Sequence, residues 1–164
     1  MAINAPPKVG NTTVEEVPSL LIPVGGRTLL VPTVSIAEIA PFSHASGEQD
    51  APDWYLGKIQ WRDQQVPLLS FEVINGEARP AIHSRCRVAV FNNTGVSEDL
   101  PFLALPTQGI PRLARVNAEE LSQREAATKA FELMHVSLAG ENAVIPDVAA
   151  LERAYLDYRA SRGP

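Results

Sequence analysis

The side chains that could perform chemistry are scattered along the sequence rather than gathered in a motif. The three histidines, His44, His83 and His135, are far apart and share no metal-ligand spacing. Carboxylates such as Glu98 and Asp99 are adjacent, so they would point in different directions on a strand and be solvated in a loop. The sequence contains no glycine-rich phosphate loop and no nucleophile elbow. We therefore expect no catalytic residue, no metal site and no cofactor.

Composition restricts the compartment and the kind of partner. The 164 residues carry a net charge of −5 and have a pI near 5.2, which argues against general nucleic-acid binding because such binding rests on a basic patch. A single cysteine, Cys86, excludes an internal disulfide and a multi-cysteine zinc site. The N-terminus lacks the apolar segment of a secretory signal, and no apolar stretch approaches the roughly 20 residues that a membrane span needs. We expect a cytoplasmic protein that does not insert into a membrane.

The residues best suited to protein contacts are aromatic and basic. Trp61 precedes Arg62 near the expected tip of a hairpin, and Trp54 and Tyr55 follow a loop. Trp, Tyr and Arg are the residues that most often anchor protein interfaces. For Trp61 taken alone, burial in the core is the favoured interpretation. These features suit a contact surface better than a catalytic site.

The elements that must position these residues are short strands. Fourteen prolines and ten glycines divide the chain into short segments, which favours strands and turns over long helices. Ile59 and Trp61 alternate with polar neighbours, with the period of a half-buried strand. Four hairpins are predicted, over residues 20–31, 56–69, 87–105 and 133–145. Many short strands with few helices indicate an all-β fold, either a closed barrel or a sandwich.

One helix is clear, at the C-terminal end. Asp147 stands at its expected N-cap, and an apolar stripe follows one face through Val148, Leu151, Tyr155 and Tyr158. This stripe should pack on a sheet.

The remaining segments are less regular. Residues 34–39 could be a strand or one helical turn, and Asn117 could cap a short helical turn. Residues 1–18 are expected to be a flexible tail, residues 19–158 a single domain, and residues 159–164 a C-terminal tail.

The second predicted hairpin carries a recognisable motif. Its sequence, Leu-Gly-Lys-Ile-Gln-Trp-Arg-Asp-Gln-Gln-Val-Pro-Leu-Leu over residues 56–69, resembles the CheW signature "G-x-x-N-L-R-G-x-x-V-P-V-x-D-L". Upstream, residues 36–39 resemble the "V-x-E-I" element of the same family. Residues 86–121 resemble its second barrel, and residues 131–158 its closing hairpin and terminal helix. The resemblance to CheW-like coupling proteins covers residues 19–158.

The resemblance implies two intertwined five-stranded β-barrels and a non-catalytic role. Members of the family couple methyl-accepting chemoreceptors to the histidine kinase CheA by protein contact, so the chain would be a chemotaxis adaptor or scaffold in the cytoplasm, peripheral to receptor arrays. The partner-binding residues that it implies are Glu38, Trp61, Arg62 and Asp63, and Glu38 and Arg62 lie at the groove where receptor helices are thought to dock. Arg62 could pair with Glu38 or with acidic residues of a receptor, and both possibilities stay open.

Several motif positions differ from the family pattern. Gln60 stands in place of the Asn, Trp61 in place of the Leu, and Asp63 in place of the turn Gly, while Glu72 reverses the charge of the Arg in "D-L-R". This divergence suits an accessory CheW-like protein, for example one in a chemosensory system that controls type IV pili and twitching motility. The alternatives are a small β-barrel hydrolase, which needs a pocket with perturbed titratable groups, and a ligand-binding β-domain, which needs a lined cavity.

Overall fold

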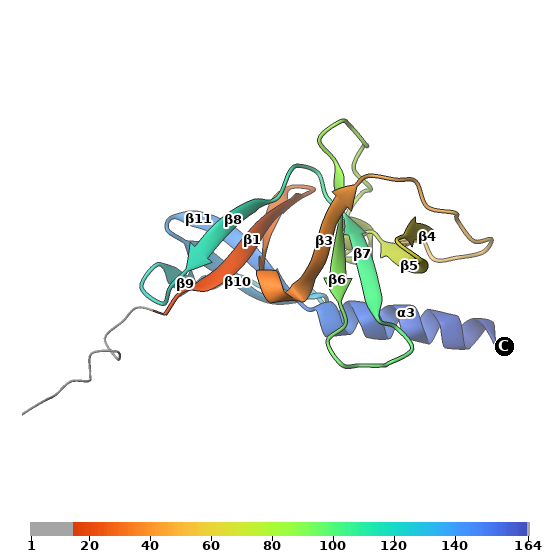
Figure 1. Ribbon diagram of the computed structural model, residues 1–164. Helices are drawn as coiled ribbons and strands as arrows, with labels where there is room; N and C mark the ends of the chain where they lie inside the picture. The colour runs from red at the N-terminus through yellow and green to blue at the C-terminus, as the bar shows by residue number, and fades with distance from the viewer. Residues whose placement is uncertain (1–14, 164) are drawn as a thin grey trace, which may run out of the picture.

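Eleven strands in two sheets dominate the structure. The computed structural model describes residues 15–163. The first sheet contains β1 (Val17–Val24), β2 (Arg27–Pro32), β8 (Arg112–Val116), β9 (Leu121–Gln123), β10 (Glu132–Leu138) and β11 (Glu141–Pro146). The second contains β3 (Ile36–Pro41), β4 (Tyr55–Trp61), β5 (Gln64–Leu69), β6 (Arg87–Asn92) and β7 (Phe102–Pro106). We call the two sheets, each with the side chains that it encloses, the first lobe and the second lobe; they lie side by side in Figure 1.

The two lobes are interleaved along the chain. The strand order is β8-β1-β2-β11-β10-β9 in the first sheet and β3-β6-β7-β5-β4 in the second. The first sheet therefore combines strands from both ends of the domain, and β2 pairs in parallel with β11 at Leu29 and Val144. The second lobe is inserted between β2 and β8.

The prediction of a mainly β fold with a C-terminal helix is confirmed, and the four hairpins form near the predicted positions. Residues 33–39 combine both expected conformations, a 3-10 turn (Thr33–Ser35) followed by β3. The first sheet has six strands rather than five. Asn117 does form a turn, accepting hydrogen bonds from the backbone NH groups of Glu119 (2.9 Å) and Glu120 (3.0 Å), but the chain then enters β9 instead of a helix because it pairs with β10.

Three apolar clusters hold the sheets together. One lies inside the first lobe around Val136, and another inside the second lobe around Val66. The largest lies between the lobes, where Leu29 of the first sheet, Phe91 of the second and Leu151 of the helix are all buried. Because the lobes share this core, they pack as one body.

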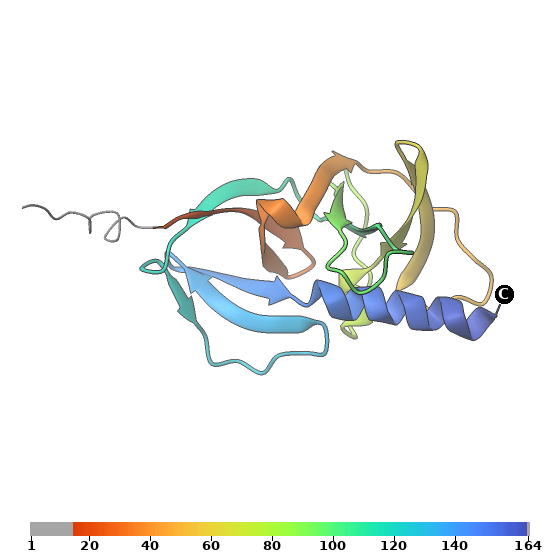
Figure 2. The ribbon, with the colours of Figure 1, turned by 60° about the horizontal axis from the view of Figure 1, so that its bottom comes forward.

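The helix α3 (Val148–Arg162) covers one side of this shared core (Figure 2). Asp147 caps it as predicted, since its carboxylate accepts a hydrogen bond from the backbone NH of Ala150 at 3.0 Å. The predicted stripe is also confirmed: Leu151, Tyr155 and Tyr158 are buried, and Val148 packs against the same cluster.

The ends of the domain differ from the expected tails. β1 begins at Val17, and residues 1–14 of the predicted N-terminal tail lie outside the described residues. At the other end α3 continues to Arg162, so residues 159–162 are helical rather than part of a tail.

Contacts of Glu48 explain why the helix continues. Its carboxylate accepts hydrogen bonds from the hydroxyls of Tyr55 (3.0 Å) and Tyr158 (2.9 Å), and from the guanidinium of Arg159 (2.9 Å). Burial alone would raise the pKa of Glu48, but these donors outweigh it and hold the pKa below its ordinary value. The loop between β3 and β4 is thus tied to the last turns of α3.

We expect Glu48→Ala to lower the free energy of unfolding by about 2 kcal/mol, because it leaves charged and hydroxyl donors without their acceptor. Chemical denaturation would measure the loss, and hydrogen exchange should show faster opening of the last two turns of α3. The adjacent exposed residue provides a control, Gln49→Ala, which should change neither quantity. Equal effects of the two substitutions would contradict this role for Glu48.

The turn between β10 and β11 is conformationally demanding. Its two residues, Ala139 and Gly140, have φ angles of 49° and 86°. Both are positive, as in the type I′ turns that favour Asn-Gly, whereas a left-handed alanine is strained. The sequence Ala-Gly is therefore a suboptimal choice for this hairpin.

Ala139→Asn should raise the free energy of unfolding by about 1 kcal/mol, because asparagine tolerates the left-handed conformation better than alanine does. Thermal or urea unfolding would measure it. The same change at the exposed Ala126, which lies in the connector before β10, should have no effect. No gain at position 139 would mean that the turn relaxes without strain.

Candidate partner-binding surface

The predicted site residues meet where the two outer strands of the second sheet approach each other. β3 and β4 stand at opposite ends of the strand order, so we call the line between them the seam. A single backbone bridge joins Ser46, after β3, to Lys58 of β4. Gly57 makes this approach possible: its φ is 113°, and a Cβ atom there would lie 2.1 Å from the carbonyl oxygen of Ser46. The glycine of the sequence motif is thus required by the fold.

Side chains complete the seam. Oε1 of Glu38, on β3, accepts hydrogen bonds from Nε1 of Trp61 at 3.0 Å and from Nη2 of Arg62 at 3.1 Å. The sequence left open whether Arg62 pairs with Glu38 or with a partner, and the structure contains the internal pair. Both side chains are nevertheless exposed, Arg62 by 66% and Glu38 by 40%. An ion pair this open to water contributes little stability, so both charges are accessible to another protein.

Trp61 lies underneath this pair. Its ring is 7% exposed and packs on Phe102, with ring centroids 4.8 Å apart. The guanidinium of Arg62 lies over its other side, 4.6 Å from the ring centroid. Trp61 therefore belongs to the core of the second lobe, as the favoured interpretation of that residue alone had it, and it offers a partner little surface.

The tight turn between β4 and β5 presents the remaining site residue. Arg62 occupies its first position with φ at 53°, and Asp63 follows, exposed. Beside the turn is an open groove of about 470 Å³, lined among others by Glu38, Phe42 and Gln60. The structure thus brings Glu38, Trp61 and Arg62 into contact and places Asp63 next to them at the rim.

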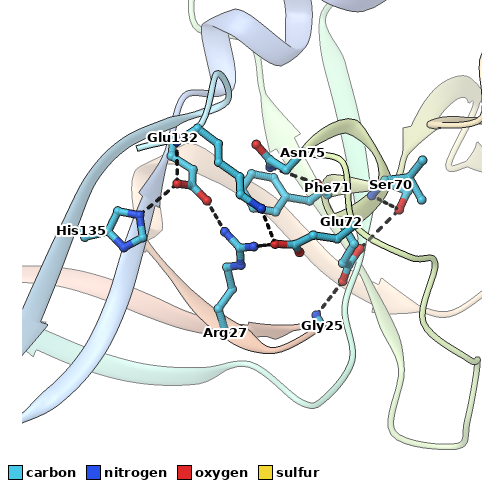
Figure 3. Close-up of polar contacts among 11 residues, drawn as sticks. Gly25, Arg27, Ser70, Phe71, Glu72, Asn75, Glu132 and His135 are labelled. Carbon is cyan, nitrogen blue, oxygen red and sulfur yellow. Dashed lines mark hydrogen bonds and ion pairs between the residues drawn. The ribbon is translucent and has the colours of Figure 1, made fainter. Parts of the chain in front are cut away.

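A second polar cluster, which the sequence analysis missed, links the two lobes (Figure 3). Arg27, at the start of β2, forms ion pairs with Glu132 of β10 and with Glu77, which follows the short helix α2 (Phe71–Ile74) of the second lobe. Nζ of Lys129 also contacts Glu77, at 2.8 Å. Together with His135, these residues form what we call the inter-lobe network.

Glu132 is the most buried charge of this network, with 1% of its side chain exposed. It accepts hydrogen bonds from the backbone NH of Lys129 and interacts with Nε2 of His135, both at 2.9 Å. Burial alone would raise the pKa of Glu132, but the Lys129 NH, His135 and the Arg27 guanidinium outweigh it and hold the pKa below its ordinary value. The carboxylate is therefore fully paired and acts as a structural anchor.

A second link lies beside the network. The backbone NH of Gly25, in the β1–β2 turn, donates to Oε2 of Glu72 at 2.7 Å, and Ser70 caps α2. Sequence alone could not bring these residues together, because they come from segments that are distant along the chain. The one available signal was the reversed charge at Glu72.

The chemistry of these clusters suits binding rather than turnover. Within residues 15–163, no three His, Cys, Asp or Glu side chains gather in a way that could hold a metal ion. No helix in the described part of the chain is long and apolar enough to cross a membrane. The accessible charges lie at the seam and the buried ones are paired or hydrogen-bonded, so the surface at the seam is the candidate functional site.

Comparisons with known proteins agree with this architecture. The family model of the CheW-like domain matches residues 18–154. Among solved structures, the chain is similar to the scaffolding protein TtCheW from Thermoanaerobacter tengcongensis, with a TM-score of 0.68 and 10% sequence identity, over 80% of this chain and 89% of that one. At this identity the likeness shows the fold alone. No curated protein matches the chain.

Proposed function

This chain belongs to the CheW-like domain family, and from that premise we propose that it couples chemoreceptors to a CheA-type histidine kinase. Proteins of this family are non-catalytic scaffold adaptors of chemotaxis signalling, so the chain is an adaptor and not an enzyme. Membership also argues against the alternative of a small hydrolase.

The observation that carries the proposal is the exposed pair of Glu38 and Arg62 beside an open groove. Opposite charges held next to each other can recognise a partner with the complementary pattern, because each can exchange its internal contact for an external one. Asp63 adds a further exposed charge at the rim. We assign partner contact to these residues, with Trp61 holding Arg62 in position.

The divergence of the motif supports a specialised role. Gln60, Trp61 and Asp63 alter the hairpin that carries Arg62, and a partner of this chain must fit the altered surface. We propose an accessory adaptor in the cytoplasm, peripheral to receptor arrays, and suggest a chemosensory system for type IV pili and twitching motility as its setting.

A pull-down from a lysate of the source organism tests the proposal. The purified chain serves as bait, and Arg62→Glu serves as a second bait that has the same fold and an altered seam. Recovery of a CheA-type kinase or a methyl-accepting receptor by the native bait, and its loss with the variant, would support the proposal. If a CheW from the same organism retains these proteins and the chain does not, the proposal is wrong.

A further inference from the structure

We propose that the second lobe contains a binding site for a small organic ammonium ion, in which Glu72 receives the charged group. The inference rests on a cavity and a buried carboxylate, independently of the seam, and it goes beyond the proposed adaptor function.

The cavity lies beside α2 and has a volume of about 230 Å³. Its walls are mostly apolar and include Leu56, Leu68 and Ile82. Its polar groups are few, with Ser70 and Glu72 among them. An apolar hollow with a small number of convergent polar groups is the usual form of a small-molecule site.

Glu72 is the unusual member of this lining. The residue is 3% exposed, yet among residues 15–163 no Lys, Arg or His forms an ion pair with it. Oε2 accepts a short hydrogen bond from the backbone NH of Gly25 (2.7 Å), whereas Oε1 has only a long one from the hydroxyl of Ser70 (3.3 Å). Both donors are neutral. A buried carboxylate without a cationic partner is costly, and a cation in the adjoining cavity would remove that cost.

Size and lining define the class of ligand. The hollow suits a compound of about one ring, and its apolar walls favour a hydrocarbon body. The carboxylate favours a primary ammonium group, which can donate to Oε1 without displacing the Gly25 NH from Oε2. Two exposed cationic or titratable side chains, His44 and Arg79, also line the cavity, so the opposite preference, for an anion, must be tested directly.

Three probes of nearly equal shape separate these possibilities: benzylammonium, benzyl alcohol and benzoate. Each would be titrated into the isotope-labelled full chain while the backbone amide resonances are followed. We expect benzylammonium to bind at least ten-fold more tightly than either of the others, with shifts centred on Leu56, Leu68 and Ser70. Equal binding of the three, tighter binding of benzoate, or no binding of benzylammonium would each overturn the proposal.

Matched variants test the role of the carboxylate. Glu72→Gln keeps an acceptor for the Gly25 NH and removes only the charge, so it should weaken benzylammonium binding at least ten-fold and leave benzyl alcohol unaffected. The same change at the exposed Glu98 should have no effect. If Glu72→Gln does not fold, Ile82→Trp decides: Ile82 is 45% exposed, and a tryptophan there would fill the mouth and abolish binding. Unchanged benzylammonium binding in the folded variants would show that the cavity is not the site.

Discussion

Glu132→Ala is expected to lower the free energy of unfolding by about 3 kcal/mol, because removing one partner of a buried ion pair leaves the others desolvated and unpaired. Arg27 would retain Glu77, but the Lys129 NH and His135 would lose their shared acceptor. Urea denaturation would measure the loss. The affected contacts join β10 to β2 and to the second lobe, so the cooperativity of unfolding should be examined in the same experiment.

A surface ion pair of the same lobe provides the control. Arg112 and Glu141 form a pair with both side chains well exposed, so Glu141→Ala should change stability by less than about 0.5 kcal/mol. Similar losses from Glu132→Ala and Glu141→Ala would contradict the assigned role of the inter-lobe network.

The pH dependence of Glu132→Gln follows from the direction of the pKa shift. The folded state holds the pKa of Glu132 below its ordinary value of 4.5, so the ionised carboxylate stabilises the fold above that pH. This contribution is lost as the pH falls through the folded-state pKa. The difference in unfolding free energy between the native protein and Glu132→Gln should be constant near neutral pH and shrink in acid. A difference that persists unchanged in acid would assign the effect to packing.

Arg62→Glu is expected to weaken binding of the chemosensory partner roughly 30-fold, equivalent to about 2 kcal/mol, because it places like charges together where the complementary pattern is needed. The melting temperature should change little, since the pair with Glu38 is exposed and an exposed ion pair contributes about 0–1 kcal/mol. Calorimetric titration of the partner recovered in the pull-down would measure the affinity, and thermal unfolding would monitor the fold.

Two further variants separate recognition from structure. Arg112→Glu disrupts an equally exposed Arg–Glu pair on the first lobe and should leave binding unchanged. The double variant Glu38→Arg with Arg62→Glu restores an internal pair of reversed polarity, and we expect it to remain defective in binding. Full recovery in the double variant would mean that the pair only closes the seam and does not contact the partner.

Local sequence patterns were sufficient to predict the elements of this fold. The hairpins follow from alternating apolar residues and turn glycines, and α3 from the capping Asp147 and its buried stripe. The pairing of Glu38 with Arg62 was one of two possibilities that the motif left open. These predictions succeeded because each depends on residues close in sequence or on a motif with a fixed geometry.

Long-range pairing could not be predicted in the same way. Leu121 begins a strand only because β10 lies beside it, and Arg27 and Glu132 form an ion pair only because the lobes interleave. The burial of Trp61 depends on Phe102 from a different strand. In each case the deciding contact joins segments whose distance in space is not written in either of them.

The interleaved strand order also bears on how the protein forms during synthesis. The five strands of the second sheet are contiguous in the chain and can pair as soon as β7 has left the ribosome. The parallel edge of β2 must wait for β11, the last strand to be translated, and remains unpaired until then. Such late, non-local pairing is slow and exposes a strand that can associate with other chains. A nascent chain stalled before residue 141 would therefore hold a formed second lobe beside an incomplete first one.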